Sequence, residues 1–266
     1  MFAGTRRIRP SGRRAGHRDM KPVALVPVYN HAATVGAVVR ALHDLALPVL
    51  LIDDGSSAEC AAVLDALAGL SATILLRLPV NGGKGGAVMA GLREAHAHGF
   101  SHVLQIDADG QHDAAALAAF LAAMVEAPQA VIVGFPRYDA SVPKSRWLGR
   151  YATHLWVWIN TLSRRIRDSM CGLRIYPLAA TLPVLDAMPP WSRMEFDTEI
   201  LVRLDWADVP IRNLPVAVHY PPDGVSHFQP WRDNVRISWM HARLFFGMLR
   251  RLPKLIGRHF PAEEPH

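Results

Sequence analysis

The sequence contains little cysteine and no long apolar segment. Its two cysteines, Cys60 and Cys171, are too few for a disulfide framework and lack the spacing of metal ligands, which favours a reducing compartment. We expect both thiols to be buried as small hydrophobic side chains. No run of 18 or more apolar residues is present, so the sequence predicts no membrane-spanning helix. The arginine-rich first twenty residues lack a following apolar segment, which excludes a secretory signal peptide.

The positive charge of the chain is concentrated at its two ends. Of 266 residues, 50% are hydrophobic and 20% are charged, with a net charge of +6, a balance typical of a globular protein with a sizeable core. Residues 1–21 and residues 232–258 each hold seven basic residues and one acidic residue. Basic ends suit an anionic membrane surface or a nucleic acid. We expect residues 1–20 to form a disordered basic tail, with Met20 as an alternative start of the protein.

Apolar runs that alternate with helical patterns predict an α/β fold. Strands separated by helices form parallel βαβ units, so we expect a doubly wound, mostly parallel sheet flanked by helices. The expected strands cover residues 22–28, 49–52, 73–78, 102–106 and 130–133, and the expected helices cover residues 33–45, 58–69, 87–98 and 113–126.

The alternation fades after residue 136. Pro215 interrupts a strand-like segment at residues 209–218, which predicts an edge strand because proline cannot donate a ladder hydrogen bond. We expect one domain over residues 21–230, followed by a basic amphipathic helical appendage over residues 231–266. Within the second half, the pattern predicts a tryptophan-rich helix at 144–163, a strand at 172–176, and helices at 178–187 and 195–205. Residues 231–258 are expected to form one basic amphipathic helix or a helix pair, interrupted near Pro253.

Polar motifs follow three of the expected strands, at the point where each strand ends. They are Tyr29-Asn30, Asp53-Asp54 and Asp107-Ala108-Asp109. In a doubly wound sheet, ligands bind beyond the carboxyl ends of the strands, so this coincidence predicts a nucleotide site. Two carboxylates one residue apart can bind Mg²⁺ or Mn²⁺, which neutralises charge on a nucleotide diphosphate leaving group. A phosphate-binding loop of the form Gly-x-x-x-x-Gly-Lys-Ser/Thr is absent, which disfavours a Walker-type NTPase.

The order of these motifs resembles that of family 2 inverting glycosyltransferases, which have the GT-A fold. The likeness covers residues 22–220 and is closer to the branch of dolichyl- and polyprenyl-phosphate sugar synthases. The segments that carry it are residues 26–30, 52–56, 81–87, 107–112, 168–174 and 195–199. The Gln-x-x-Arg-Trp signature of processive members is absent, which favours transfer of a single sugar.

The resemblance implies a set of donor contacts and metal ligands. The metal, Mg²⁺ or Mn²⁺, would bind to Asp107 and Asp109, with Gln111 as a further oxygen ligand. Asp54 suits a uracil or guanine edge, because a carboxylate accepts hydrogen bonds from ring N–H groups. The residues implied to contact the nucleotide sugar are Pro27, Tyr29, Asn30, Asp54, Lys84, Gly85, Asp107, Ala108 and Arg137.

Residues for catalysis and for the acceptor are expected in the second half of the chain. Inverting transfer to a hydroxyl needs a carboxylate that takes the acceptor proton, and we favour Asp197 over its neighbours Glu195 and Glu199. A phosphate acceptor is already anionic, in which case Asp197 would only position groups. Arg174 is expected at the catalytic site as a phosphate binder, with Arg137 and Arg146 as weaker candidates. On the acceptor side, the resemblance points to Ser226 and His227.

These features predict an enzyme that moves one sugar, with inversion, from a UDP- or GDP-sugar to a lipid-linked or polyprenyl-phosphate acceptor. The expected partners are that donor, that acceptor and an anionic membrane surface bound by residues 232–258, but no nucleic acid. We expect a cytoplasmic protein that associates peripherally with the inner face of the cell membrane. Two alternatives are a sugar-1-phosphate nucleotidylyltransferase and an inactive module that binds membranes or nucleic acid.

Overall fold

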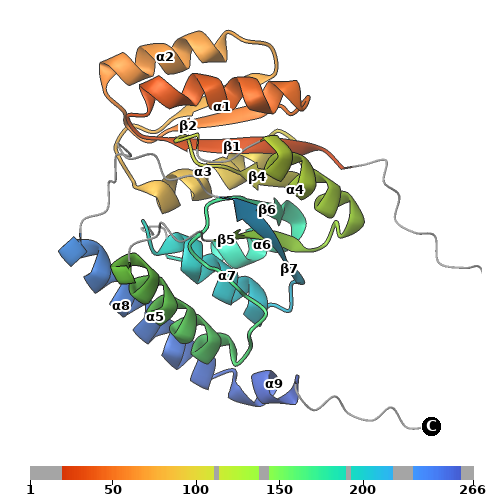
Figure 1. Cartoon of the computed structure of the whole chain (residues 1–266), viewed down its shortest axis with the longest axis vertical. Coiled ribbons are helices and arrows are strands. Elements are labelled where there is room, and N and C mark those ends of the chain that lie inside the picture. Colours follow the sequence, from red (N-terminus) through yellow and green to blue (C-terminus); the bar gives the residue numbers. More distant parts are fainter. Residues whose placement is uncertain (1–19, 111–113, 138–143, 190–192, 218–229, 259–266) are drawn as a thin grey trace, which may run out of the picture.

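A seven-stranded sheet forms the centre of the protein (Figure 1). The computed structural model describes residues 20–110, 114–137, 144–189, 193–217 and 230–258. The strand order is β3-β2-β1-β4-β6-β5-β7, and every neighbouring pair is parallel except the two that involve β6. The strands are β1 (Pro22–Val28), β2 (Val49–Asp53), β3 (Thr73–Arg77), β4 (His102–Gln105), β5 (Val131–Arg137), β6 (Arg174–Pro177) and β7 (Ile211–Ala217).

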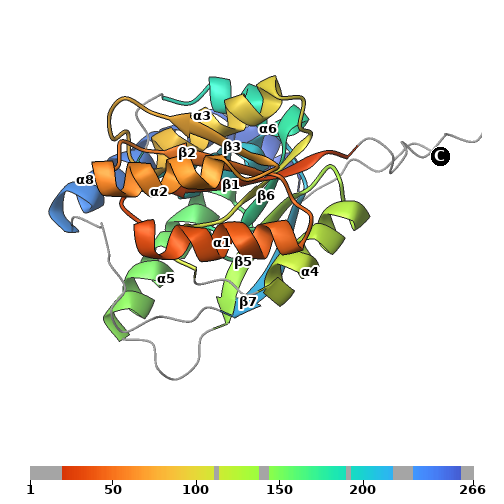
Figure 2. The same cartoon turned by 90° about the horizontal axis from the view of Figure 1, so that it is seen from above.

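Helices cover both faces of the sheet, so that two apolar layers form (Figures 1 and 2). The alternation of side chains along each strand divides the core: Val23 and Leu25 of β1 point to one layer, and Ala24 and Val26 point to the other. One face carries α1 (Ala32–Asp44), α2 (Ala58–Ala68) and α4 (Ala114–Glu126), and the other carries α3 (Lys84–Ala97), α5 (Lys144–Thr161), α6 (Leu178–Asp186), α7 (Phe196–Trp206), α8 (Pro230–Leu249) and α9 (Leu252–Gly257).

The expected elements are present, with three differences that have physical reasons. Helix α3 begins at Lys84, three residues earlier than predicted, because Gly83 adopts a φ of 80° as the N-cap residue, so that the helix starts within the glycine-rich segment of residues 81–86. Strand β5 extends to Arg137, since β7 pairs with it along its whole length. Strand β6 lies antiparallel between β4 and β5, an insertion that the βαβ alternation did not predict. Pro215 lies in the edge strand β7, as predicted.

Close packing of α3 on the sheet depends on Gly91. A Cβ atom at this position would lie 2.3 Å from Cδ1 of Leu25, so only glycine allows this approach. The N-terminus of α3 is thereby held at the carboxyl edge of β1 and β2. Both cysteines are free and buried, as expected, and burial raises the pKa of the Cys171 thiol to about 11.

The last two helices share the core of the α/β domain. Helix α8 packs against α5 and α7, and its side chains Met240, Leu244 and Met248 belong to the same apolar layer as Phe196 of α7. The core is thus continuous across residue 230, where the sequence pattern placed the start of an appendage. Among the described helices, none combines the length and apolar character that crossing a membrane requires.

Candidate active site

The ends of β1 and β2 are joined by hydrogen bonds through Asn30. Its backbone N–H donates to Oγ of Ser56 at 3.2 Å, and its Oδ1 accepts from the backbone N–H of Ser57 at 2.8 Å. Asn30 has a φ of 59°, a left-handed conformation that asparagine tolerates better than most residues. Asn30, which we expect to contact the nucleotide sugar, therefore also fixes the geometry at the ends of β1 and β2. Pro27 in β1 and Tyr29 just after β1 are each half-buried.

Asp54 holds the glycine-rich loop of residues 81–86. Its carboxylate accepts hydrogen bonds from the backbone N–H groups of Gly82 at 2.7 Å and Gly83 at 2.9 Å, and from Nδ2 of Asn81 at 3.0 Å. Asp54 is only 2% exposed, and burial raises its pKa although the hydrogen bonds from Gly82 and Gly83 oppose the shift. In this structure the Asp54 carboxylate, which we expected to contact a base edge, anchors the loop beside the predicted nucleotide site.

Arg193 also anchors this loop. Its guanidinium donates to Oδ1 and to the backbone carbonyl of Asn81, both at 3.0 Å, and its own carbonyl accepts from the N–H of Gly85 at 3.1 Å. A Cβ at Gly83 would lie 2.7 Å from Cγ of Arg193, so the arginine lies directly on the glycine. The sequence pattern did not single out Arg193, because its contact joins segments 112 residues apart. Its position just before the 195–199 motif was the one signal that could have indicated it.

Three predicted site residues meet at Lys84. Its Nζ lies 2.7 Å from Oδ1 of Asp107 and 3.0 Å from Oδ2 of Asp197. Burial by itself would lower the pKa of Lys84, but the two carboxylates outweigh burial and raise it well above its usual range. Lys84 therefore stays protonated between the residue expected to bind the metal and the residue expected to face the acceptor.

Asp197 lies in the first turn of α7 and is held from the side opposite Lys84. Its Oδ1 lies 3.4 Å from Nε2 of Gln105 and 3.5 Å from Nη1 of Arg174, and its backbone carbonyl accepts from the same guanidinium at 2.6 Å. Glu199, two residues later, points away into an ion-pair cluster with Arg203 and is fully buried. The two carboxylates thus lie on different faces of the helix, as their spacing predicts.

Arg174 is a buried positioning residue, and the expected contact with phosphate does not fit its surroundings. It is fully buried, and its donors reach the backbone carbonyls of Cys171 at 2.9 Å and Ser169 at 2.7 Å as well as the hydroxyl of Tyr176 at 3.1 Å. The reason is its place on β6, the strand inserted antiparallel beside Gln105 of β4. Its charge serves Asp197 and the 168–173 loop instead of a ligand.

The Asp107-Ala108-Asp109 segment alternates half-buried acidic residues with a buried alanine. Ala108 is buried in the core, and its carbonyl accepts from Oγ1 of Thr34 at 2.6 Å, whereas Asp107 and Asp109 on either side are half-buried. A Cβ at Gly172 would lie 2.2 Å from Oδ2 of Asp107, so the 168–173 loop packs directly against this carboxylate. Within this segment, Ala108 therefore packs into the core, and the two flanking aspartates remain partly accessible.

A divalent ion fits this segment by the chemistry of its donors. Carboxylate oxygens are the ligands that Mg²⁺ and Mn²⁺ prefer, and such ions keep several waters or phosphate oxygens in addition. Within the described residues, no group of three or more His, Cys, Asp or Glu side chains forms a complete cage. Two carboxylates and a donor diphosphate would share such an ion, so Asp107 and Asp109 suit a metal that arrives with its nucleotide.

The remaining predicted residues are less closely connected to this centre. Gly85 is buried in the first turn of α3, and Arg137 is exposed at the end of β5. Gln111, Ser226 and His227 lie outside the described residues, as does the side chain of Arg146. The structure thus brings together Lys84, Asp107 and Asp197. Asp54 holds the loop that precedes Lys84, and Asp109 follows Asp107 by two residues.

Comparison with known proteins gives this arrangement a family. The model of the family described as "Glycosyl transferase family 2" matches residues 23–181, which is more than half of the chain. The chain belongs to glycosyl transferase family 2. This glycosyltransferase assignment agrees with the resemblance of its motifs and disfavours the nucleotidylyltransferase and inactive-module alternatives.

Two curated relatives act on lipid phosphates according to their names. The UDP-N-acetylglucosamine–dolichyl-phosphate N-acetylglucosaminyltransferase of Methanococcus voltae is 24% identical over 213 residues, covering 71% of this chain and 84% of the relative. The undecaprenyl-phosphate mannosyltransferase of Micrococcus luteus is 29% identical over 175 residues, covering 63% of this chain and 70% of the relative.

Solved structures share the fold of this family 2 glycosyltransferase. Glucosyl-3-phosphoglycerate synthase from Mycobacterium tuberculosis, in complex with Mn²⁺, UDP and glucosyl-3-phosphoglycerate, superposes with a TM-score of 0.62 at 16% identity, covering 86% of this chain and 80% of that one. Mannosyl-3-phosphoglycerate synthase from Rubrobacter xylanophilus gives a TM-score of 0.59 at 20% identity, and the match covers 92% of this chain and 78% of that one. The chain therefore has the GT-A fold, as predicted.

Proposed function

We propose that this glycosyltransferase moves a single sugar from a UDP- or GDP-sugar to a polyprenyl-phosphate or other lipid-linked acceptor, with inversion at the anomeric carbon. The observation that carries the proposal is the contact of Lys84 with both Asp107 and Asp197, which joins a donor side and an acceptor side at one point. The names of the two lipid-phosphate relatives support the acceptor class.

The donor side consists of the glycine-rich loop and the two aspartates after β4. Asp54 and Arg193 both hold the loop, which places Lys84 at the start of α3 close to Asp107. Asp107 and Asp109, with Gln111, would hold Mg²⁺ or Mn²⁺. When bound, that ion would offset the negative charge that develops on the nucleotide diphosphate as it leaves.

The acceptor side is built around Asp197. An acceptor oxygen forms its bond to the anomeric carbon while the bond from that carbon to the diphosphate breaks on the opposite face, which inverts the configuration. If the acceptor is a hydroxyl, Asp197 takes its proton; if it is a phosphate, Asp197 orients it without proton transfer. Gln105 and Arg174 hold Asp197 in place for either role. We retain Ser226 and His227 as proposed acceptor contacts.

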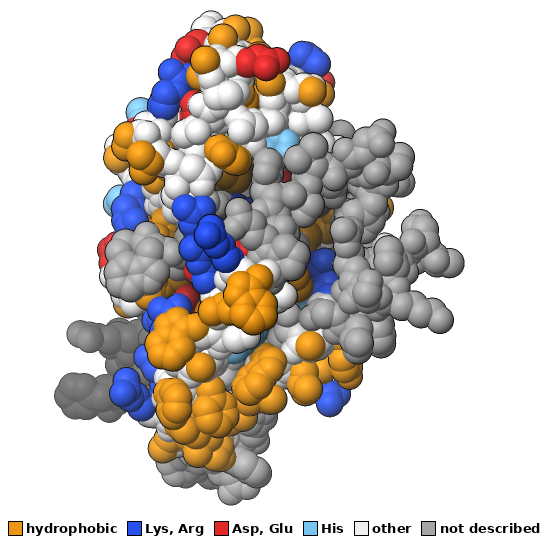
Figure 3. Space-filling model, turned by 90° about the vertical axis from the view of Figure 1, so that its left-hand side faces the viewer, with side chains coloured by type: hydrophobic (Ala, Val, Ile, Leu, Met, Phe, Trp, Pro, Cys, Tyr) orange, Lys and Arg blue, Asp and Glu red, His pale blue; other side chains and the backbone are white. Residues whose placement is uncertain are grey.

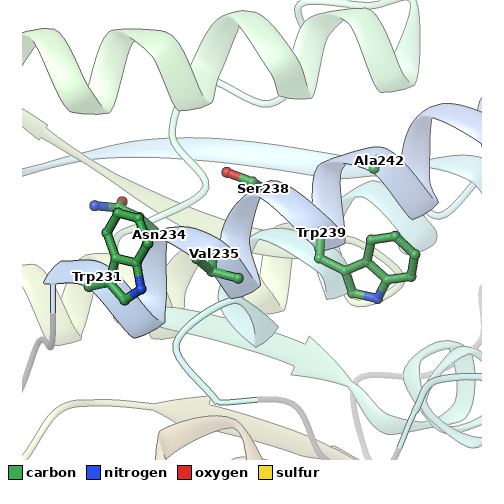
Figure 4. A pocket seen from close by; sticks show the side chains of 6 residues that line it. All are labelled: Trp231, Asn234, Val235, Ser238, Trp239 and Ala242. Carbon is green, nitrogen blue, oxygen red and sulfur yellow. The ribbon is translucent and has the colours of Figure 1, made fainter.

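A lipid-linked acceptor requires contact with a membrane, and α8 offers an apolar surface for it. We define the aromatic surface as the exposed side chains Trp231, Val235, Trp239 and Phe246 of α8. They are spaced four, four and seven residues apart, which is about one or two helical turns. Apolar side chains gather on this side of the molecule (Figure 3). Trp231 is 82% exposed and Trp239 is 66% exposed. A shallow groove runs between them, lined also by Asn234, Ser238 and Ala242 (Figure 4).

The basic residues of α8 and α9 contribute less to this surface than their number suggests. Arg243, Lys254 and Arg258 form ion pairs with acidic side chains of α7 or the residues just after it, and Arg251 lies over the ring of Trp206 at 4.6 Å. Arg232, Arg236 and Arg250 are exposed. We therefore propose peripheral association with the cytoplasmic face of the cell membrane, in which inserted aromatic side chains provide more of the affinity than charge does.

The function is tested by assaying purified protein with polyprenyl phosphate in detergent, a panel of UDP- and GDP-sugars, and Mn²⁺ or Mg²⁺. We expect one donor to yield a lipid-linked monosaccharide whose anomeric configuration, measured by NMR, is opposite to that of the donor. Retention of configuration, or formation of a nucleotide sugar from a sugar phosphate, would contradict the proposal.

A further inference from the structure

Lys84 lies between two carboxylates that the proposed reaction uses for different purposes. Asp107 is expected to bind the metal, and Asp197 is expected to face the acceptor; Nζ of Lys84 is 2.7 Å from the first and 3.0 Å from the second. We propose that Lys84 is an exchangeable counter-ion, which opposes metal binding to Asp107 until the donor diphosphate draws the ammonium away. This inference rests on the proposed function, because it takes Asp107 as a metal ligand.

The first step in the argument is the cost of binding a metal alone. A divalent ion at Asp107 would have to bind beside the Lys84 ammonium or displace it from the Asp107 oxygen that it contacts. The side chain of Lys84 is 20% exposed, so water screens the repulsion between the two cations only in part. Displacement would also remove the closest cation from Asp197. Either course weakens the affinity of the donor-free protein for metal.

The second step is the charge that the nucleotide diphosphate brings. Its phosphate oxygens can pair with the metal and with Lys84 at the same time, so the competition for Asp107 ends when the donor binds. Lys84 is the first residue of α3, and its backbone is fixed there by the Gly83 turn, while its flexible side chain is free to turn toward a new partner. Metal and nucleotide should therefore strengthen each other's binding.

The third step concerns Asp197, which remains in place when Lys84 moves. Gln105 lies 3.4 Å from its Oδ1, and Arg174 donates to its backbone carbonyl at 2.6 Å. Departure of Lys84 thus frees Oδ2 of Asp197 without requiring a shift of α7. The acceptor-side carboxylate becomes available only after the donor has bound, which orders the two substrates.

The experiment compares Mn²⁺ binding by calorimetry, with and without UDP or GDP, in the wild-type protein and in Lys84→Met. Without nucleotide, we expect Lys84→Met to bind Mn²⁺ at least about tenfold more tightly than wild type, because the competing charge is gone. The nucleotide should strengthen Mn²⁺ binding less in Lys84→Met than in wild type. Lys84→Arg, which keeps the charge, should bind Mn²⁺ alone no more tightly than wild type. Lys21→Met, which removes an exposed lysine before β1, should match wild type in both measurements.

The counter-ion role would be overturned if wild type and Lys84→Met bound Mn²⁺ alone with equal affinity while wild type still bound nucleotide in a Mn²⁺-dependent way. That outcome would leave the proposed function standing. Failure of wild type and of every variant to bind nucleotide or Mn²⁺ would instead contradict the metal-dependent function itself, and the counter-ion role with it. Thermal unfolding checks the fold of each variant, and Lys84→Gln provides the same comparison if Lys84→Met unfolds.

Discussion

Glycine and aspartate determine the geometry of the metal side of the site. Oδ2 of Asp107 lies so close to Gly172 that a Cβ atom there would approach it to 2.2 Å. A Cβ atom and a carboxylate oxygen cannot approach each other this closely in a folded protein. Either the loop or the Asp107 carboxylate must therefore move if Gly172 is replaced. A residue distant from Asp107 in the sequence thus sets its orientation.

We expect Gly172→Ala to weaken Mn²⁺-dependent nucleotide binding by about tenfold or more, because the added methyl displaces a metal ligand. Calorimetric titration with UDP or GDP in the presence of Mn²⁺ measures the change. Gly86→Ala is the matched control, since a Cβ at Gly86 meets nothing within 4 Å. Equal affinities for Gly172→Ala and wild type would contradict the claim that Gly172 sets the orientation of a metal-binding Asp107.

The role of Asp197 depends on the chemistry of the acceptor. For a hydroxyl acceptor, Asp197→Asn should lower turnover by about 10²–10⁴-fold with little change in donor affinity, since a general base is lost. For a phosphate acceptor, we expect a much smaller loss. Steady-state rates and donor binding are measured together, with Asp186→Asn as the control because Asp186 is exposed on α6. Unchanged turnover on a hydroxyl acceptor would remove Asp197 from the base role.

At the scale of elements, α5 is tied to the loop that supports Asp107. Arg150 of α5 forms two hydrogen bonds with the Asp168 carboxylate, at 2.6 and 2.9 Å, and Nε2 of His154 lies 3.3 Å from it. The same carboxylate accepts from the backbone N–H groups of Met170 and Cys171, which shape the loop before Gly172. Through Asp168, α5 therefore helps to hold the loop that packs against Asp107.

This cluster predicts a pH-dependent contribution to stability. Burial acts to raise the pKa of Asp168, but hydrogen bonds from His154 and Arg150 outweigh it and hold the pKa far below the usual range. A lowered carboxyl pKa stabilises the fold above the unfolded pKa of about 4, and that stabilisation is lost as the pH falls further toward the folded pKa.

We therefore expect Asp168→Asn to lower the free energy of unfolding by about 3–5 kcal/mol at pH 7, because the half-buried Arg150 loses its buried partner. The deficit relative to wild type should shrink below about pH 4. Urea unfolding of both proteins at pH 7 and pH 3 tests this, with Asp65→Asn, which alters an exposed ion pair, as the control. A deficit that stays constant with pH would contradict the assignment.

At the scale of the whole molecule, α7 joins the reaction centre to the aromatic surface. Its first turn carries Asp197, while Glu199 pairs with Arg243 of α8 at 3.0 Å and Asp205 pairs with Arg258 after α9 at 3.0 Å. Both acids are fully buried, so these contacts fix α8 and α9 to the catalytic helix. Removal of the C-terminal helices would expose the core, and surface substitutions are the better test of membrane contact.

We expect Trp231→Ser combined with Trp239→Ser to weaken binding to anionic vesicles by about tenfold or more, because two inserted indole rings are lost. Sedimentation with phosphatidylglycerol–phosphatidylcholine vesicles measures the affinity, and added salt should weaken wild-type binding only moderately. Leu70→Ser, on exposed α2–β3 loop surface, is the control. Equal sedimentation of the double variant and wild type would exclude the aromatic surface as the anchor.

The sequence by itself determined the central sheet and the family motifs. Local signals were sufficient there: short apolar runs form the strands, and Asp54 and Asp107 follow strand ends, where parallel strands place a ligand site. Arg174 and Arg193 could not be placed in this way, because their roles depend on partners far along the chain. Nothing in the local pattern distinguishes an arginine that binds phosphate from one that is buried against carbonyl groups.

Only the tertiary structure decided how the motifs act on one another. The antiparallel insertion of β6 brings Arg174 beneath Asp197, and the start of α3 brings Lys84 between Asp197 and Asp107. It also divided the C-terminal helices into a buried face that pairs with α7 and an exposed aromatic face, although composition gave both the same basic, apolar character. The physical reason is that composition and periodicity record which residues avoid water or carry charge, whereas the partner that each one meets is fixed by packing between distant segments.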